Sequence, residues 1–177
     1  MRFISNSVGS RTAFEYIANV PITALDLLRV ESYLLFYPYD MSEYFPFADG
    51  SVGDSLWELG LDFTVSKDKT GFRGADAHAR LKGKERFKIY GVELTSDKAP
   101  ETGDKLTVDG REVGVITIGM VSKLTGRSLG IARLEPAFAV AGTDLTLVGA
   151  QGSVAAKAQP LCPGDRRQSA AAGKAAK

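Results

Sequence analysis

The chain has 177 residues, of which 44% are hydrophobic and 24% are charged, and its formal net charge is +1. This balance is typical of a globular protein with one ordinary domain or two small ones, and it argues against a protein held to nucleic acid by bulk charge. Cys162 is the only cysteine, which excludes an internal disulfide and fits a reducing compartment. No membrane helix or secretory signal is recognisable, so we expect a cytoplasmic protein without membrane contacts.

Helix signals dominate the first 80 residues. The segment SRTAFEYIANV is a plausible short helix. Thr23 is a good N-cap, and Asp26, three residues on, resembles a capping box, so a second helix is predicted over residues 24–35. On that helix Arg29 and Asp26 can pair in solvent. Aromatic side chains then crowd residues 36–63, where core packing is favoured over stacking on a flat ligand.

Glu31 stands out within the predicted helix. The residues three and four positions away are all leucines, Leu27, Leu28, Leu34 and Leu35. A buried carboxylate without a partner would cost several kcal/mol or hold a proton, so Glu31 needs a partner. One interpretation is an internal partner, such as a backbone amide or a lysine. The other is that Glu31 lines a cavity and accepts paired N–H donors from a ligand, as a guanidinium or an aminopyrimidine edge would offer.

The second part of the chain, residues 82–149, is typical of short strands broken by glycine turns. Asp109-Gly110 is a strong signal for a two-residue hairpin, because both residues tolerate positive φ. The spacing indicates a small antiparallel barrel or sandwich. The strands are predicted at about residues 88–94, 105–108, 112–120, 128–134 and 144–148. Residues 150–177 are poor in large apolar side chains and are predicted to form a disordered tail.

Other candidate sites are weak. His78 is the only histidine, and with one cysteine in the chain no metal site is expected. His78 is predicted to lie at the surface, and the basic run around it is interpreted as a solvated face. Cys162 has no histidine near it in sequence and is not expected to be a nucleophile.

Four segments, in the right order, resemble the aminomethyltransferase family, whose type member is the T-protein of the glycine cleavage system. ALDLLRVES is similar to the family's A-x-D-x-L-R-x-E-A signature, and FYPYDM to its L-Y-G-x-D-M. SLWELGLDFTVSKDKTGFRGADAHARLKG resembles the family's next segment, and within it WELGLDF is more similar to the branch that demethylates aryl methyl ethers or dimethylsulfoniopropionate. VDGREVGVITIGMVSKLTGRSLGIARLEP resembles the family's C-terminal barrel.

The resemblance implies an α+β fold, in which part of a folate-binding α/β region (residues 1–80) precedes a C-terminal antiparallel β-barrel (residues 82–149). It also implies tetrahydrofolate as the cofactor. Glu31 matches the family's glutamate that binds the pteridine ring. Tyr37 and Asp40 match a tyrosine and an aspartate that are expected to shape the pocket, and Trp57 is the further aromatic candidate. The implied function is tetrahydrofolate-dependent one-carbon transfer, of the aminomethyltransferase or the O- or S-demethylase type.

The resemblance covers only the C-terminal half of the family's chain. The family's catalytic aspartate belongs to the other half, so no catalytic residue is assigned here. We therefore expect a complementing N-terminal chain, or self-association that covers apolar side chains of the 24–36 region. The alternative is a non-catalytic folate-binding or interaction module, or a remnant of such an enzyme.

Overall fold

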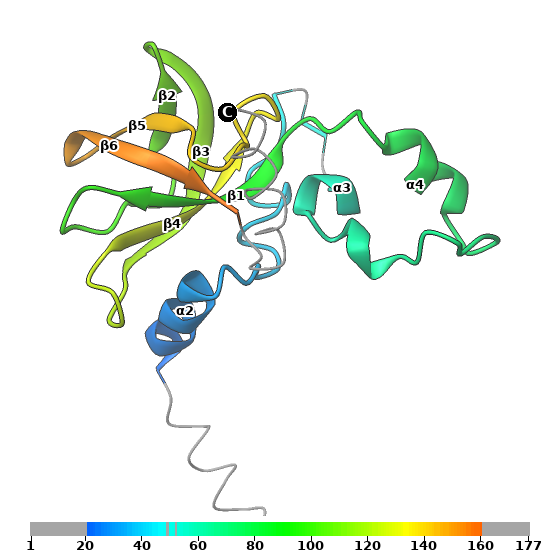
Figure 1. The fold of residues 1–177 in the computed structure, drawn as a ribbon, viewed down its shortest axis with the longest axis horizontal. Coiled ribbons are helices and arrows are strands. Elements are labelled where there is room, and N and C mark those ends of the chain that lie inside the picture. Colours follow the sequence, from blue (N-terminus) through cyan, green and yellow to red (C-terminus); the bar gives the residue numbers. More distant parts are fainter. Residues whose placement is uncertain (1–20, 49, 52, 161–177) are drawn as a thin grey trace, which may run out of the picture.

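A closed barrel of six antiparallel strands forms the centre of the molecule, and helices and turns precede it in the chain (Figure 1). The computed structural model describes residues 21–48, 50–51 and 53–160. The first predicted helix and Cys162 lie outside the described residues. Before Lys88 the described residues contain helices and turns only, so the α+β fold class is confirmed. None of the helices in the described part of the chain is long and apolar enough to cross a membrane.

The strands close in the order β1-β4-β3-β2-β5-β6. Their bounds are β1 Lys88–Leu94, β2 Lys105–Val108, β3 Arg111–Val121, β4 Ser128–Leu134, β5 Asp144–Gly149 and β6 Gly152–Gln159. The first five coincide with the predicted strands to within a residue at each end. The predicted hairpin is present too: Asp109 and Gly110 have φ of 51° and 79°, and β2 pairs with β3 directly across them.

Side chains that alternate inward from all six strands fill the barrel. Leu106, Ile116, Leu134 and Leu147 are fully buried there. Burial of a leucine or isoleucine side chain contributes about 1.5–3 kcal/mol, so this core accounts for the stability of the barrel.

The expectation of a disordered tail from residue 150 is wrong for β6. The strand lies between β1 and β5 and closes the barrel, with Ala156 and Ala158 buried in its interior. A small barrel has room for few large side chains, so alanines serve as core residues in its last strand. Gly152, with φ of 90°, forms the turn from β5. Within β6 the low content of large apolar residues therefore reflects the narrow interior of the barrel.

Helix α2 spans Ile22–Glu31 and lies against the outside of the barrel near β3 and β4. Its predicted start and end are wrong. Pro21, and not Thr23, occupies the N-cap position, and no side chain caps the helix. The expected pairing of Asp26 with Arg29 is present, at 2.9 Å, but it is partly buried rather than in solvent. The helix ends early because Tyr33 adopts a φ of 51°, and its ring packs onto the barrel at Gly91.

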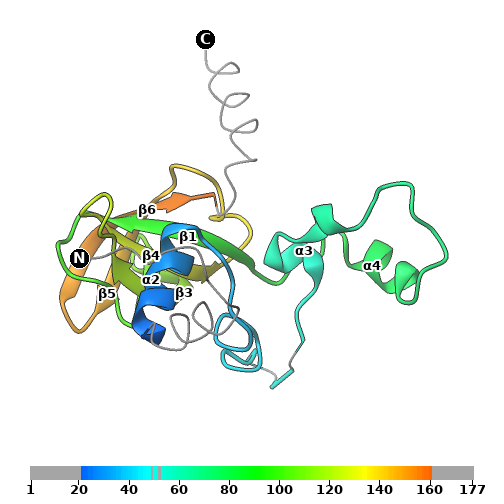
Figure 2. The same cartoon turned by 90° about the horizontal axis from the view of Figure 1, so that it is seen from below.

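An arm of short helices projects from the barrel on another side from α2 (Figures 1 and 2). It contains α3 (Leu56–Leu59), the 3₁₀ helix η1 (Asp62–Thr64) and α4 (Ala75–Leu81). Ser55 and Glu58 form a capping box at the start of α3. None of residues 61–86 is buried, so the arm depends on its base at α3 for its attachment.

Candidate functional site

The Glu31 carboxylate lies at the end of α2 and contacts the turn between β3 and β4. Its Oε1 accepts hydrogen bonds from the Ser122 hydroxyl at 2.7 Å and from the amides of Lys123 at 2.9 Å and Leu124 at 3.4 Å. The hydroxyl donor lowers the pKa of Glu31, partial burial opposes this, and the two amides lower the pKa further. The predicted internal partner is thus present and consists of one hydroxyl and two amides. The carboxylate is negatively charged at neutral pH.

Tyr33 holds this end of α2 on the barrel. A Cβ atom at Gly91 would lie 2.6 Å from Cε1 of the Tyr33 ring, so the ring occupies space that only glycine leaves free. Burial, together with the nearby charge of Glu93, raises the pKa of Tyr33 to about 12. Val30 is also fully buried. These contacts explain why Glu31 faces the β3–β4 turn.

Asp40 is fully buried, and both of its carboxyl oxygens have partners. Oδ1 accepts from the Thr117 hydroxyl on β3 at 2.5 Å. Oδ2 accepts from Arg29 Nη1 at 2.7 Å and from the Phe36 amide at 2.8 Å. Asp40 therefore ties α2 and the segment after it to the barrel, and a ligand would have to replace one of these partners to reach it.

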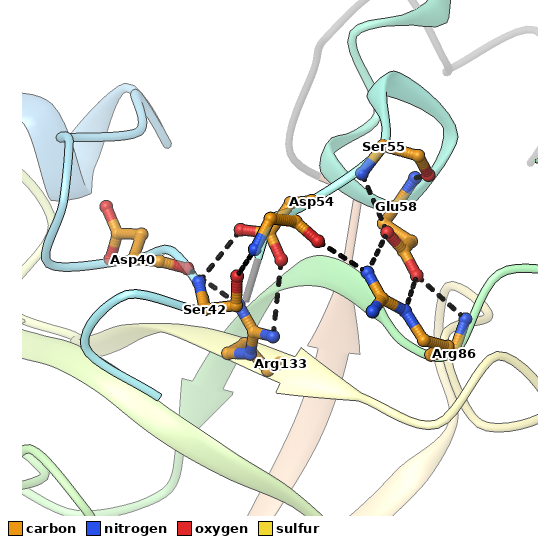
Figure 3. Close-up of polar contacts among 8 residues, drawn as sticks. Asp40, Ser42, Asp54, Ser55, Glu58, Arg86 and Arg133 are labelled. Carbon is orange, nitrogen blue, oxygen red and sulfur yellow. Dashed lines mark hydrogen bonds and ion pairs between the residues drawn. The ribbon is translucent and has the colours of Figure 1, made fainter. Parts of the chain in front are cut away.

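A buried arginine, Arg133 on β4, continues the polar contacts (Figure 3). Its guanidinium stacks on the Phe87 ring at 3.6 Å and donates to the Asp40 carbonyl at 3.3 Å. It also lies 3.5 Å from Oδ1 of Asp54, whose Oδ2 accepts the Ser42 amide at 2.8 Å. Burial lowers the pKa of Arg133, and the charge of Asp54 opposes that effect. This cluster joins the 40–54 segment to the barrel wall.

Glu58 anchors the arm. Its side chain is 2% exposed and accepts both Nε and Nη2 of Arg86, at 2.7 and 3.0 Å, as well as the Ser55 amide at 2.7 Å (Figure 3). Burial by itself would raise the pKa of Glu58. The donors from Arg86 and Ser55 outweigh burial and bring the pKa down to about 2.

The structure does not bring the four predicted site residues together. Tyr37 is exposed on the turn that precedes Asp40. Trp57 belongs to the arm, where its ring stacks on His78 at 4.7 Å and its Nε1 donates to the His78 carbonyl. His78 is therefore partly covered by this stack rather than free at the surface. Of the four, Glu31 and Asp40 both connect to α2: Glu31 is its last residue, and Asp40 accepts a hydrogen bond from Arg29 on the same helix.

An open groove of about 610 Å³ lies between residues 44–48 and strands β3 and β4. Phe47, Arg86 and Arg133 are among the residues that line it, and the four predicted site residues are not. The sequence analysis did not identify Arg133. Its position inside the apolar run SLGIARL could have indicated it, because a charged residue there needs a partner, as Glu31 does. Ser122 gave no comparable signal.

Comparisons with known proteins agree with this geometry. Residues 88–163 match the family described as the glycine cleavage T-protein C-terminal barrel domain. Over these residues the chain is similar to the C-terminal barrel of the T-protein. The resemblance to the C-terminal portion of the aminomethyltransferase family is thereby confirmed.

Two curated relatives differ in how similar they are to this chain. The heme-dependent oxidative N-demethylase gamma subunit of Ectopseudomonas mendocina is 62% identical over 127 residues, which are 72% of this chain and 34% of the relative. An aminomethyltransferase of Thermoanaerobacter pseudethanolicus is 30% identical over 128 residues, which are 71% of this chain and 32% of the relative. The match therefore spans about a third of the length of these relatives.

A solved structure shares the fold. The glycine cleavage system aminomethyltransferase T from Bartonella henselae superposes with a TM-score of 0.68 at 21% identity, and the match covers 80% of this chain and 38% of that one. The barrel and the described segments before it therefore share the fold of that structure.

Proposed function

We propose that the chain takes part in tetrahydrofolate-dependent one-carbon transfer, and that Glu31 accepts an N–H donor of the pteridine ring. The observation that carries the proposal is the Glu31 carboxylate itself, which is negatively charged, only partly buried and fixed against the barrel by Ser122 and two amides. A charged acceptor held in place suits the donor edge of an aminopyrimidine ring. The aminomethyltransferases and the N-demethylase subunit among the relatives support the same function.

The cofactor fits Glu31 better than the other predicted residues. Tetrahydrofolate would supply the nitrogen that accepts the one-carbon unit. Within the described residues no partner is found for Oε2 of Glu31, whereas both oxygens of Asp40 are engaged. Asp40 and Tyr37 are proposed to shape the surroundings of the ring. Trp57 belongs to α3 and Glu31 to α2, and these two helices lie on different sides of the barrel (Figure 1). No catalytic residue is assigned.

Replacing Glu31 with glutamine should abolish or strongly weaken tetrahydrofolate binding, because the amide offers a neutral acceptor in place of a charged one. Anaerobic calorimetry of the purified chain measures this directly. Glu135→Gln is the matched control, since it removes a carboxylate that pairs with Arg111 on the barrel surface. Equal binding by Glu31→Gln and the wild type would contradict the proposed contact, and so would the absence of binding by the wild type.

We also propose a partner polypeptide, on which the interaction-module alternative depends as well. Ile22, Leu25 and Leu28 lie on one side of α2 and are 60%, 51% and 59% exposed. An apolar helix face of this kind is typical of an interface. The relative named as a gamma subunit supports a partner subunit, and the proposed complementing chain would cover the same face.

Without its partner the purified chain should self-associate through this face, so that its apparent mass rises with concentration. Leu25→Ser combined with Leu28→Ser should reduce that rise, as measured by light scattering. Phe63→Ser is the control, because Phe63 is exposed on the arm and not on α2. A wild-type chain that stays monomeric at all concentrations would contradict the exposed interface.

A further inference from the structure

The contact between Glu31 and the β3–β4 turn involves only one of the two carboxylate oxygens. All three hydrogen bonds end on Oε1. A carboxylate oxygen has two lone pairs, so three donors saturate it. No interaction of Oε2 is found in the part of the chain that the structure describes. The two oxygens of Glu31 are therefore not equivalent, and the bidentate acceptor expected from the sequence is replaced by a single available oxygen.

Ser122 fixes which oxygen is engaged. Its side chain is 2% exposed, and its Oγ accepts the amides of Leu124 at 3.2 Å and Thr125 at 3.1 Å. A hydroxyl has one proton and two acceptor lone pairs. Because both lone pairs face amides, the proton points to Glu31, at 2.7 Å.

The main chain around Ser122 is held as well. Its amide donates to the Arg127 carbonyl at 2.8 Å, and its carbonyl accepts from the Gly126 amide at 2.9 Å. These two bonds close the turn between β3 and β4. The hydroxyl therefore belongs to a rigid turn and does not depend on a freely rotating side chain.

We propose that Ser122 is a positioning residue for ligand binding: the β3–β4 turn holds Oε1 of Glu31 so that Oε2 alone is presented to an N–H donor of the pteridine. This inference rests on the proposed function, since it assigns how the same site is held. It predicts that the turn and the ligand act together on one carboxylate and do not compete for it.

The first test needs no ligand. In Ser122→Ala the pH midpoint of the Glu31 side-chain carboxyl, followed by NMR, should rise, because the hydroxyl that stabilises the charged form is gone. Ser122→Thr keeps a hydroxyl and should restore the midpoint. Thr125→Ala is the control, because it removes a hydroxyl of the same turn that contacts the Arg127 amide and not Glu31. An unchanged midpoint in Ser122→Ala overturns the inference and leaves the proposed function standing.

The second test is tetrahydrofolate binding by the same variants. Loss of one positioning hydrogen bond should weaken binding about two- to tenfold in Ser122→Ala, with recovery in Ser122→Thr and no change in Thr125→Ala. Thermal unfolding of each variant shows whether the fold is kept. Tighter or unchanged binding in a folded Ser122→Ala overturns the inference, since the turn would then compete with the ligand or not matter. Failure of the wild type to bind overturns the proposed function and the inference together.

Discussion

Replacing Asp40 with alanine should lower the free energy of unfolding by about 3–5 kcal/mol. The carboxyl group is fully buried and joins three separate parts of the chain: Arg29 on α2, the Phe36 amide and the Thr117 hydroxyl on β3. Alanine would remove the acceptor of the partly buried Phe36 amide and one of the two acidic partners of Arg29. It would also leave the buried Thr117 hydroxyl with only the Ile131 carbonyl, at 3.2 Å. Groups left unpaired in this way carry their full desolvation cost.

Urea unfolding at neutral pH, followed by far-UV circular dichroism, measures the effect. Asp144→Ala is the matched control, since Asp144 is 83% exposed and pairs with Lys157 at the surface. That pair should contribute less than about 1 kcal/mol. If Asp40→Ala cost no more than Asp144→Ala, the buried contacts of Asp40 would not stabilise the fold.

The second large effect is the loss of folding stability at low pH that the Glu58 carboxylate should cause. The pKa of Glu58 is about 2 in the folded chain, against an ordinary value of 4.5. The folded state thus binds fewer protons than the unfolded state between these values. The resulting stability is fully present above about pH 4.5 and is lost as the pH falls towards 2. Discounted for solvent screening around the partly exposed Arg86, it amounts to about 2 kcal/mol.

Glu58→Gln should therefore lower the free energy of unfolding at neutral pH by about 2 kcal/mol and flatten its dependence on pH between 4.5 and 2. Trp57 is the only tryptophan and lies beside Glu58, so its fluorescence follows the base of the arm during unfolding. Glu112→Gln removes an exposed carboxylate that pairs with Lys105 and serves as the control. Equal pH profiles for Glu58→Gln and the wild type would contradict the role of the Glu58–Arg86 pair.

The barrel strands could be predicted because their signals are local. Period-two alternation and Asp109-Gly110 act over a few residues, and they placed five strands within a residue. β6 escaped because its inward residues, Ala156 and Ala158, do not look like core residues until the narrow barrel around them is known. The start of α2 was misplaced because Pro21, and not Thr23, occupies the N-cap position, and of the two contacts predicted for Asp26 only the pair with Arg29 forms.

The site was only partly predictable. The leucines around Glu31 showed that the carboxylate needed a partner, and that expectation needs no structure. The partner, Ser122, lies 91 positions further along the chain, and only barrel closure places it there. Asp40 and Thr117 are 77 positions apart, and Glu58 and Arg86 are 28 apart. Contacts between such distant residues leave no periodic pattern in the sequence. The sequence can therefore show that a buried charge needs a partner, but it does not identify the partner.

The closure of the barrel by β6 has a consequence for synthesis on the ribosome. β6 pairs with β1, the first strand, and with β5. Until residues 152–159 have emerged, β1 and β5 each present an unpaired edge to the surroundings. Open strand edges are templates for pairing with other chains. The nascent protein is therefore exposed to this kind of pairing until β6 has emerged, and the small alanine-rich strand is the one that closes both edges.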